Sequence, residues 1–397
     1  MLRVIWLFVV TIAVAGTAES SVLDLCDKVT FTAGNDKVRV EQVVGHAGKA
    51  MQFTFAQECT NTFAMGRVRG RPEWDRAAGI SFWVKGDGSA ALGALQFVWN
   101  DDYAVRYDAS FPITSTAWTK VVIPWSELIP VAANEKSVPL DPAGERKPSQ
   151  LGQLWFGKWW YWREYPTHSY VIDDLQLEPT IALDAVDHRP SGAPLARVVA
   201  KLKAGQPLTV VTMGDSLTDT HHWSNRTTNW PAYFRSAVQE RWKSAVTLVN
   251  PAIGGTELKQ NLVLIPRWTT STPTPDLVTM CFGFNDWSNG MRPERFKPAM
   301  IDAIRRVRRA TKGAADVLVI ATLPGMPLWD ELGGLAQAGR DAAAQEHAGL
   351  CDGYAVFMAA AKDGGRERLF VDDQVHLSPL GQQALAQAVI DSLATSK

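Results

Sequence analysis

The sequence has little that suggests a metal, a nucleotide or a nucleic acid as a partner. Its four cysteines form no Cys-x-x-Cys pair and lie at no histidine spacing that suits zinc. It has no Walker loop and no Gly-x-Gly-x-x-Gly fingerprint, so nucleotide binding has no support. The formal net charge of −1 argues against a basic field for nucleic acid or an anionic membrane. We therefore expect no cofactor, no catalytic metal and no nucleic-acid partner.

Long apolar runs are also missing, apart from one at the N-terminus. Residues 4–15 are apolar, follow Arg3 and precede the small residues 16–18, which is typical of an export signal. The run is shorter than the roughly 20 residues that cross a bilayer as a helix. We predict a signal peptide over residues 1–18 and a secreted or periplasmic protein with no membrane contact after cleavage. A membrane anchor is the alternative, because one arginine is a weak n-region.

The few cysteines fit an exported protein. In an oxidising compartment we expect Cys26 and Cys59 to form a disulfide. Cys281 and Cys351 lie in or beside apolar segments, so a disulfide between them and two buried thiols are both open.

The first part of the chain reads as β-structure. A chain of 397 residues predicts two or three domains. Over residues 19–178, short apolar runs alternate with turn residues, which favours a β-sandwich or jelly roll. Residues 179–195 lose this periodicity and contain three prolines and a glycine, which indicates a linker. The expected strands are 80–84, 95–99, 118–124, 153–162 and 170–177.

Residues 196–397 change to apolar strands alternating with helices. This order predicts an α/β domain with a parallel sheet covered on both faces. The expected strands are 207–213, 245–250, 276–282, 316–322 and 353–358, and the expected helices are 229–242, 293–311, 330–347 and 379–393.

Polar groups that suit acyl transfer follow these strands. In an open parallel sheet, ligands bind beyond the carboxyl ends of the strands. A serine hydroxyl needs a base to take its proton, and an imidazole needs a carboxylate to hold its tautomer. A developing oxyanion needs fixed hydrogen-bond donors. The residues that meet these needs are Ser216, Asp373 and His376 for the triad, and the amides of Ser216 and Gly255 with the side chain of Asn285 for the oxyanion.

Four blocks of this region resemble those of the SGNH, or GDSL, hydrolases. They are Gly214-Asp215-Ser216-Leu217, residues 250–255, Gly283-x-Asn285-Asp286 and Asp373-x-x-His376, which occur in the family's order. The resemblance implies a flavodoxin-like three-layer fold and metal-independent ester hydrolysis. It also implies that Ser216 is the nucleophile, Asp373 and His376 complete the triad, and Gly255 and Asn285 are oxyanion donors. Gly254 stands where the family often has a small polar residue, so the donor could be Gly254. Phe284 stands where many members have a smaller residue, which would narrow the acyl site.

Other roles for these residues stay open at this point. Ser216 could cap a helix after the first strand, and Asp372 could replace Asp373. His221 and His222 suggest a metal, but no partner cluster is visible, and a role at the rim of the site or in a loop is favoured. We expect Asp215 and Asp286 to hold loops.

Tryptophan is unusually frequent, and ten of the sixteen lie before residue 163. In an extended run over 155–162, one face carries Trp155, Trp159 and Tyr161 and the other carries Phe156, Trp160 and Trp162. One face should be core, and the second is either a platform for sugar rings or covered by the rest of the protein. The segments 83–88, 118–124 and 172–175 resemble jelly-roll carbohydrate-binding modules, which implies a structural calcium for which the sequence offers no evident ligands. We name Trp159, Trp160 and Trp287 as candidate substrate contacts.

The sequence therefore predicts a secreted serine esterase that removes O-acyl groups, and in particular O-acetyl groups, from a polysaccharide or oligosaccharide. The alternatives are a lipid esterase or thioesterase on the same fold, a catalytically silent glycan-binding protein, and an acyltransferase.

Overall fold

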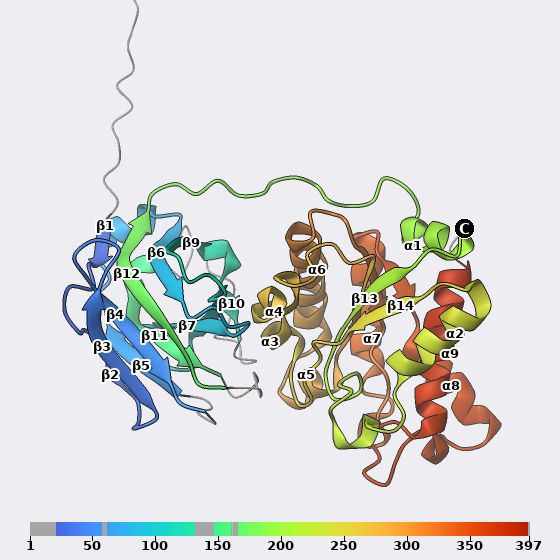
Figure 1. The fold of residues 1–397 in the computed structure, drawn as a ribbon. Helices are drawn as coiled ribbons and strands as arrows, with labels where there is room; N and C mark the ends of the chain where they lie inside the picture. The colour runs from blue at the N-terminus through green and yellow to red at the C-terminus, as the bar shows by residue number, and fades with distance from the viewer. Residues whose placement is uncertain (1–20, 58–61, 132–146, 160, 162–165, 396–397) are drawn as a thin grey trace, which may run out of the picture.

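The computed structural model describes residues 21–57, 62–131, 147–159, 161 and 166–395. A β-rich part and an α/β part are joined by an extended segment (Figure 1). The predicted signal peptide, Cys59 and Trp160 lie outside the described residues. Within the described ranges, no helix is long and apolar enough to cross a membrane.

The β-rich part consists of two antiparallel sheets, as predicted. One has the order β3-β4-β12-β6-β9 with β1 paired to β12, and the other has the order β10-β8-β7-β11-β5-β2. The strands are Ser21–Asp24 (β1), Thr32–Ala33 (β2), Val38–Val44 (β3), Lys49–Phe55 (β4), Thr62–Arg67 (β5), Gly79–Gly86 (β6), Leu92–Trp99 (β7), Arg106–Pro112 (β8), Thr119–Pro124 (β9), Ile129–Pro130 (β10), Leu151–Lys158 (β11) and His168–Glu178 (β12).

Alternation along these strands separates two apolar clusters. In β7, Leu95, Phe97 and Trp99 point into the core between the two sheets. Leu92 and Ala94 point the other way and belong to a second cluster that contains residues of the α/β part. All eight residues of β7 are buried, so both faces of this strand are covered and its sequence shows no polar alternation.

The α/β part contains a five-stranded parallel sheet of order β14-β13-β15-β16-β17. In chain order this is 2-1-3-4-5, the flavodoxin-like arrangement, which confirms the predicted fold class. The strands are Leu208–Gly214 (β13), Val246–Val249 (β14), Leu277–Cys281 (β15), Asp316–Ile320 (β16) and Gly349–Cys351 (β17). The helices are Ala196–Lys203 (α1), Trp230–Trp242 (α2), Leu258–Val263 (α3), Ile265–Thr269 (α4), Phe284–Ser288 (α5), Pro293–Ala310 (α6), Gly333–Gln345 (α7), Gly353–Ala360 (α8) and Pro379–Thr395 (α9).

The two faces of this sheet are covered by different helices. In β15, Leu277 packs into the cluster that contains residues of α1, α2, α8 and α9. The next residue, Val278, packs into the cluster that contains residues of α3, α6 and α7. Helices therefore cover both faces of the sheet, and every residue of β15 and β16 is buried.

The predicted strand over residues 353–358 is wrong. This segment begins α8, and the fifth strand is the preceding β17. Asp352 caps the helix by accepting from the amide of Ala355 at 3.1 Å, and Arg340 holds its carboxylate with two hydrogen bonds of 2.8 and 2.9 Å. Short apolar runs do not distinguish a strand from a buried helix.

The predicted disulfide of Cys26 is also not formed, because Cys26 is a buried free thiol. Cys281 and Cys351 are buried free thiols as well, so of the two possibilities left open for this pair, the structure has two thiols and no disulfide between them. They lie on β15 and β17 with β16 between them, so their strands are about 9–10 Å apart, beyond the reach of a disulfide. Burial raises the pKa of each of these thiols, so all three are inert.

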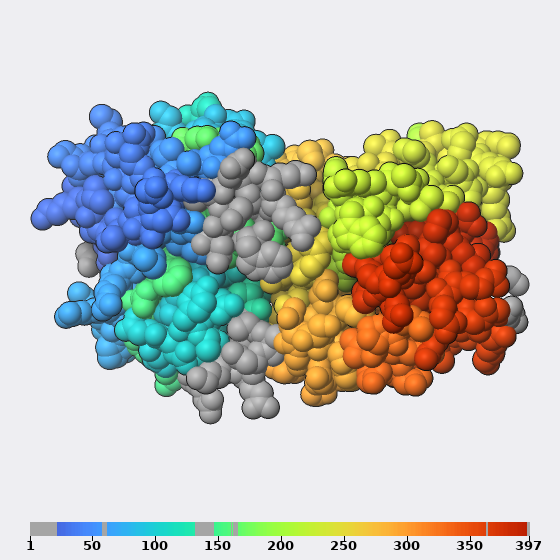
Figure 2. Space-filling view, turned by 90° about the horizontal axis from the view of Figure 1, so that it is seen from below, coloured from blue at the N-terminus to red at the C-terminus, as the bar shows by residue number. Residues whose placement is uncertain are grey.

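The two parts share an apolar interface. The outer face of the β7 sheet packs on α3 and its neighbours, and Figure 2 shows the blue and cyan segments lying against the yellow and orange ones. Ser110 on β8 donates to the carbonyl of Val263 at the end of α3 at 2.5 Å. The outer face of the sheet is thus part of a continuous core.

Arg306 on α6 adds a polar link across this interface. It is buried and donates to the carbonyl of Ser126 at 2.8 Å and to the carbonyl and carboxylate of Glu127. Arg309 makes one further bond of 2.9 Å to Glu127. Because a buried guanidinium needs several partners, this cluster favours one relative position of the two parts.

We predict that Arg306→Ala lowers the free energy of unfolding by about 3 kcal/mol, because Glu127 and two carbonyls lose their common donor. Urea denaturation measures this loss, and limited proteolysis should cut residues 179–195 faster in the variant. Arg309→Ala is the matched control and should have a smaller effect. A loss in Arg306→Ala no larger than in the control would contradict the link.

Candidate active site

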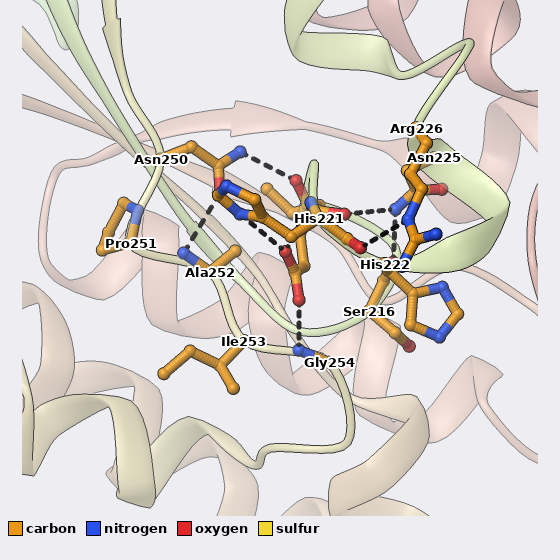
Figure 3. A network of polar contacts seen from close by, with 12 residues as sticks. Ser216, His221, His222, Asn225, Arg226, Asn250, Pro251, Ala252, Ile253 and Gly254 are labelled. Carbon is orange, nitrogen blue, oxygen red and sulfur yellow. Dashed lines mark hydrogen bonds and ion pairs between the residues drawn. The ribbon is translucent and has the colours of Figure 1, made fainter. Parts of the chain in front are cut away.

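Ser216 lies in a tight turn directly after β13. The amides of Thr218 and Asp219 both donate to the carbonyl of Asp215, at 3.0 and 2.9 Å. Ser216 begins no helix, which removes its alternative role as a helix cap. The turn is held by Asn225, whose side chain donates to the carbonyls of Ser216 at 2.6 Å and Asp219 at 2.8 Å (Figure 3). Asn225 is fully buried, so these bonds fix the position of Ser216.

His376 lies in a loop that closes on itself before α9. A bridge between Phe370 and Leu377 pairs the ends of the loop, and the amide of Val371 donates to the carbonyl of His376 at 2.8 Å. Asp373 Oδ1 accepts from the amide of His376 at 2.9 Å. The aspartate and the imidazole are therefore presented from one small rigid unit.

The structure brings Ser216, His376 and Asp373 together. Nε2 of His376 lies 2.9 Å from Oγ of Ser216, and Nδ1 lies 2.5 Å from Oδ2 of Asp373. Because an ionised carboxylate only accepts, Nδ1 carries the proton and Nε2 accepts from the serine hydroxyl. The arrangement can therefore remove a proton from Ser216 and stabilise the resulting imidazolium.

Asp373 remains ionised in this setting. Partial burial acts to raise the pKa of Asp373, but hydrogen bonds from the amide and ring of His376 and from the amide of Val375 outweigh it and leave this pKa below its usual value. Of the two neighbouring aspartates, Asp373 is the one that contacts His376.

The segment after β14 is hydrogen-bonded to the turn that carries Ser216 and contains one exposed glycine. The amide of Gly254 is already bound, since it donates to Oδ2 of Asp219 at 2.9 Å (Figure 3). Gly255 is exposed, has φ +81° and, among the described residues, makes no recorded amide hydrogen bond. Of the two glycines, Gly255 is therefore the one with an amide available to a ligand.

Asn285 follows β15 at the first turn of α5. Gly283 before it has φ +138°, and a Cβ there would lie 2.3 Å from the side chain of Thr322, so only glycine allows this turn. Asn285 Nδ2 donates to the carbonyl of Thr256 at 3.0 Å, which uses one of its two N–H groups. Among the described residues no partner is recorded for the second N–H, so it can serve a ligand, and the bond to Thr256 also ties Asn285 to the segment that carries Gly255.

Two aromatic rings lie next to His376: that of His222, for which the sequence suggested a rim or loop role, and that of Trp223, for which it suggested none. His222 stacks on the imidazole with a centroid distance of 4.3 Å and an interplanar angle of 26°. Trp223 stands against the same ring at 5.7 Å and 64°, and 57% of Trp223 is exposed. The sequence signal was present in their closeness to Ser216, but only the turn shows which way the rings point.

The candidate sugar platform in the β-rich part is largely closed. Trp159 is only 3% exposed and packs parallel to Tyr161, with centroids 5.5 Å apart, in the interface between the two parts. The prediction of Trp159 as an open platform is therefore wrong, because the α/β part covers this face. Trp160 lies outside the described residues. Trp287 is half-buried on α5, and the guanidinium of Arg292 lies 4.0 Å from the centre of its ring.

No group of three or more His, Cys, Asp or Glu side chains suited to a metal occurs in the part of the chain that the structure describes. His221 is mostly exposed, with Nδ1 3.6 Å from Asp219. His221 and His222 point to different partners, so they do not form a common ligand pair.

Three buried acids lie beneath the site. Burial raises the pKa of Asp215 and of Asp286 to about 7 each. Burial and the neighbouring charge of Asp286 raise the pKa of Glu257 to about 8. Asp286 Oδ1 accepts from the amide of Leu258 at 3.1 Å, and Asn289 donates to Glu257 at 2.8 Å. Asp215 likewise holds its own turn, by accepting from the amide of Leu217 at 2.9 Å.

Residues 212–384 match the model of the GDSL-like lipase/acylhydrolase family. The match lies within the α/β part and covers less than half of the chain. The protein is accordingly an SGNH-type carboxylic ester hydrolase.

Solved structures and curated sequences were also compared with this esterase. An acetylxylan esterase from Geobacillus stearothermophilus is similar at 19% identity and a TM-score of 0.41, over 48% of this chain and 96% of that enzyme. An α/β hydrolase enzyme from the metagenome of Lake Arreo, Spain, is similar at 19% identity and a TM-score of 0.40, over the same shares. No curated protein matches the sequence of the esterase.

We predict that the esterase loses stability as the pH rises from about 5 to about 8. The folded pKa values of Asp215, Asp286 and Glu257 lie above the unfolded values near 4. The stabilisation is therefore complete below the unfolded pKa and is lost as the pH passes the folded pKa, with a slope of at most about 1.4 kcal/mol per pH unit for each group.

Urea denaturation at several pH values measures this slope. Asp286→Asn keeps an acceptor for the amide of Leu258 but no longer titrates, so its slope should be smaller than that of the wild type. Asp341→Asn, at an exposed acid on α7, should keep the wild-type slope. If the free energy of unfolding changes with pH equally in the wild type and in Asp286→Asn, Asp286 is not protonated in the folded protein over this pH range.

Proposed function

We propose that the protein is an exported serine esterase that removes short acyl groups, and in particular acetyl groups, from the hydroxyls of a carbohydrate. The observation that carries the catalytic part is the line of two hydrogen bonds from Asp373 through His376 to Ser216. The predicted signal peptide and the β-sandwich, whose sequence resembles carbohydrate-binding modules, support export and a glycan substrate.

In the proposed reaction, Ser216 Oγ attacks the ester carbonyl while Nε2 of His376 takes its proton. The amides of Ser216 and Gly255 and Nδ2 of Asn285 donate to the oxyanion of the tetrahedral intermediate. His376 then gives its proton to the leaving alcohol, and an acyl-serine remains. A water molecule deprotonated by His376 attacks this acyl group, and Ser216 recovers its proton as the acid leaves.

A short acyl group suits the surroundings of Asn285. The neighbouring Phe284 is half-buried and packs against Gly325, where a Cβ would lie 2.6 Å from its ring. The ring fills space beside an oxyanion donor, which supports a small acyl substituent.

We predict that Ser216→Ala lowers kcat/KM on 4-nitrophenyl acetate by about 10⁴-fold or more, because the nucleophile is lost. The wild type should prefer acetate in a series of nitrophenyl esters. A maximum at roughly eight carbons or more, which would indicate apolar acyl burial, would replace the acetyl assignment with a lipid esterase. Wild-type turnover no higher than that of Ser216→Ala would instead indicate a silent binding protein.

Removing one oxyanion donor should cost less than removing the nucleophile. We predict that Asn285→Ala lowers kcat on nitrophenyl acetate by about 10²–10³-fold, with a small change in KM, because the donor acts mainly on the transition state. Asn289→Ala is the matched control: it removes an amide of the same segment that binds Glu257 rather than the site. A similar loss in both variants would mean that Asn285 acts only by holding its loop.

A further inference from the structure

Trp223 and His222 lie where the leaving alcohol of the ester would bind in the proposed reaction. The leaving oxygen must receive its proton from Nε2 of His376, so it has to come within about 3 Å of that atom. The rest of the alcohol then lies beside the imidazole. Among the described residues, the rings recorded in contact with this imidazole are those of His222 and Trp223.

His222 and Trp223 differ in how much of each ring is exposed to solvent. His222 stacks on the imidazole and is itself held, with Nδ1 2.8 Å from Oγ of Ser224. Trp223 leaves more than half of its surface in water. A large apolar ring that stays exposed forgoes the stabilisation that burial would give it, so its position has no evident benefit for the fold.

The exposed ring is nevertheless rigidly mounted. Trp223–Asn225 is a single 3-10 turn (η5), and its last residue, Asn225, is fully buried. The Asn225 side chain donates to two carbonyls of the Ser216 turn and accepts from Gln382 at 2.9 Å and Ser224 at 3.0 Å. The ring thus has a fixed place relative to the nucleophile, as a preorganised binding surface requires.

We propose that Trp223, with His222 behind it, is the leaving-group subsite of this esterase and binds the pyranose ring that carries the acyl group. The subsite rests on the proposed function, since it presupposes that Ser216 and His376 act on an ester. The C–H face of a pyranose is apolar and matches the flat face of an indole, while its hydroxyls remain in water. Stacking there places the ester oxygen of the sugar beside Nε2 of His376.

The subsite acts on acylation and not on deacylation, because the alcohol has left before water attacks. Its contribution therefore belongs to kcat/KM for esters of ring alcohols. An ester of a very small alcohol, such as methyl acetate, has nothing to stack and should not depend on Trp223.

The experiment compares kcat/KM for a mono-O-acetylated methyl xylopyranoside with kcat/KM for methyl acetate. In Trp223→Ala we expect a loss of about 10-fold or more on the sugar ester and a change of less than about 2-fold on methyl acetate. Trp223→Phe keeps a smaller ring and should recover part of the loss. His221→Ala, which removes the exposed neighbouring ring that does not contact His376, is the matched control and should behave as the wild type on both esters.

The other outcomes overturn the subsite in distinguishable ways. An equal loss on both esters would mean that Trp223 only positions His376, and no loss on either would mean that it binds nothing; in both cases the esterase assignment stands. A wild type that turns over neither ester above Ser216→Ala would end the proposed function and the subsite together. If Trp223→Ala does not fold, the Phe variant alone decides by the same comparison.

Discussion

The buried carboxamide of Asn225 is the interaction on which the site depends. It joins the turn of Ser216 to Gln382 on α9, the helix that starts three residues after His376. Nucleophile and base are 160 residues apart in the chain, so they need such a link to stay at hydrogen-bond distance. With four partners and no exposure, this side chain loses no hydrogen bonding by burial and has one position available.

The sheet explains why the remaining groups arrive at the same place. The strand order reverses between β13 and β15, and the crevice beyond this switch point is where open α/β sheets bind ligands. Ser216 follows β13, Asn285 follows β15, and Gly255 follows β14, which lies on the other side of β13. The β-rich part reaches this region as well, since β8 and β10 pack on α3, which begins three residues after Gly255.

Much of this was predictable from the sequence, for identifiable reasons. The fold class followed from the order of apolar strands and helices, and the meeting of Ser216, Asp373 and His376 followed from strand ends that share one edge. The segment after Asp352 was predicted as a strand because a short apolar run shows neither the helix period nor the strand period. Trp159 was predicted to be accessible because the sequence does not show that the α/β part covers it. The roles of His222 and Trp223 depend on the direction of two side chains in an irregular turn, which no periodicity encodes.

In the proposed function, different segments of the chain face the acyl half and the alcohol half of the ester. In the proposed reaction, the donors to the carbonyl oxygen are Gly255 and Asn285, and Asn285 is hydrogen-bonded to Thr256, the residue after Gly255. In the proposed subsite, the rings that face the alcohol are those of His222 and Trp223, in the segment that Asn225 links to the Ser216 turn by hydrogen bonds. No hydrogen bond or ring contact between Phe284 and Trp223 is recorded among the described residues, so a change in acyl preference at the first and a change in alcohol preference at the second should affect the activation free energy nearly additively. The same three residues, Ser216, His376 and Asp373, could therefore act on different esters when only one of these two segments changes.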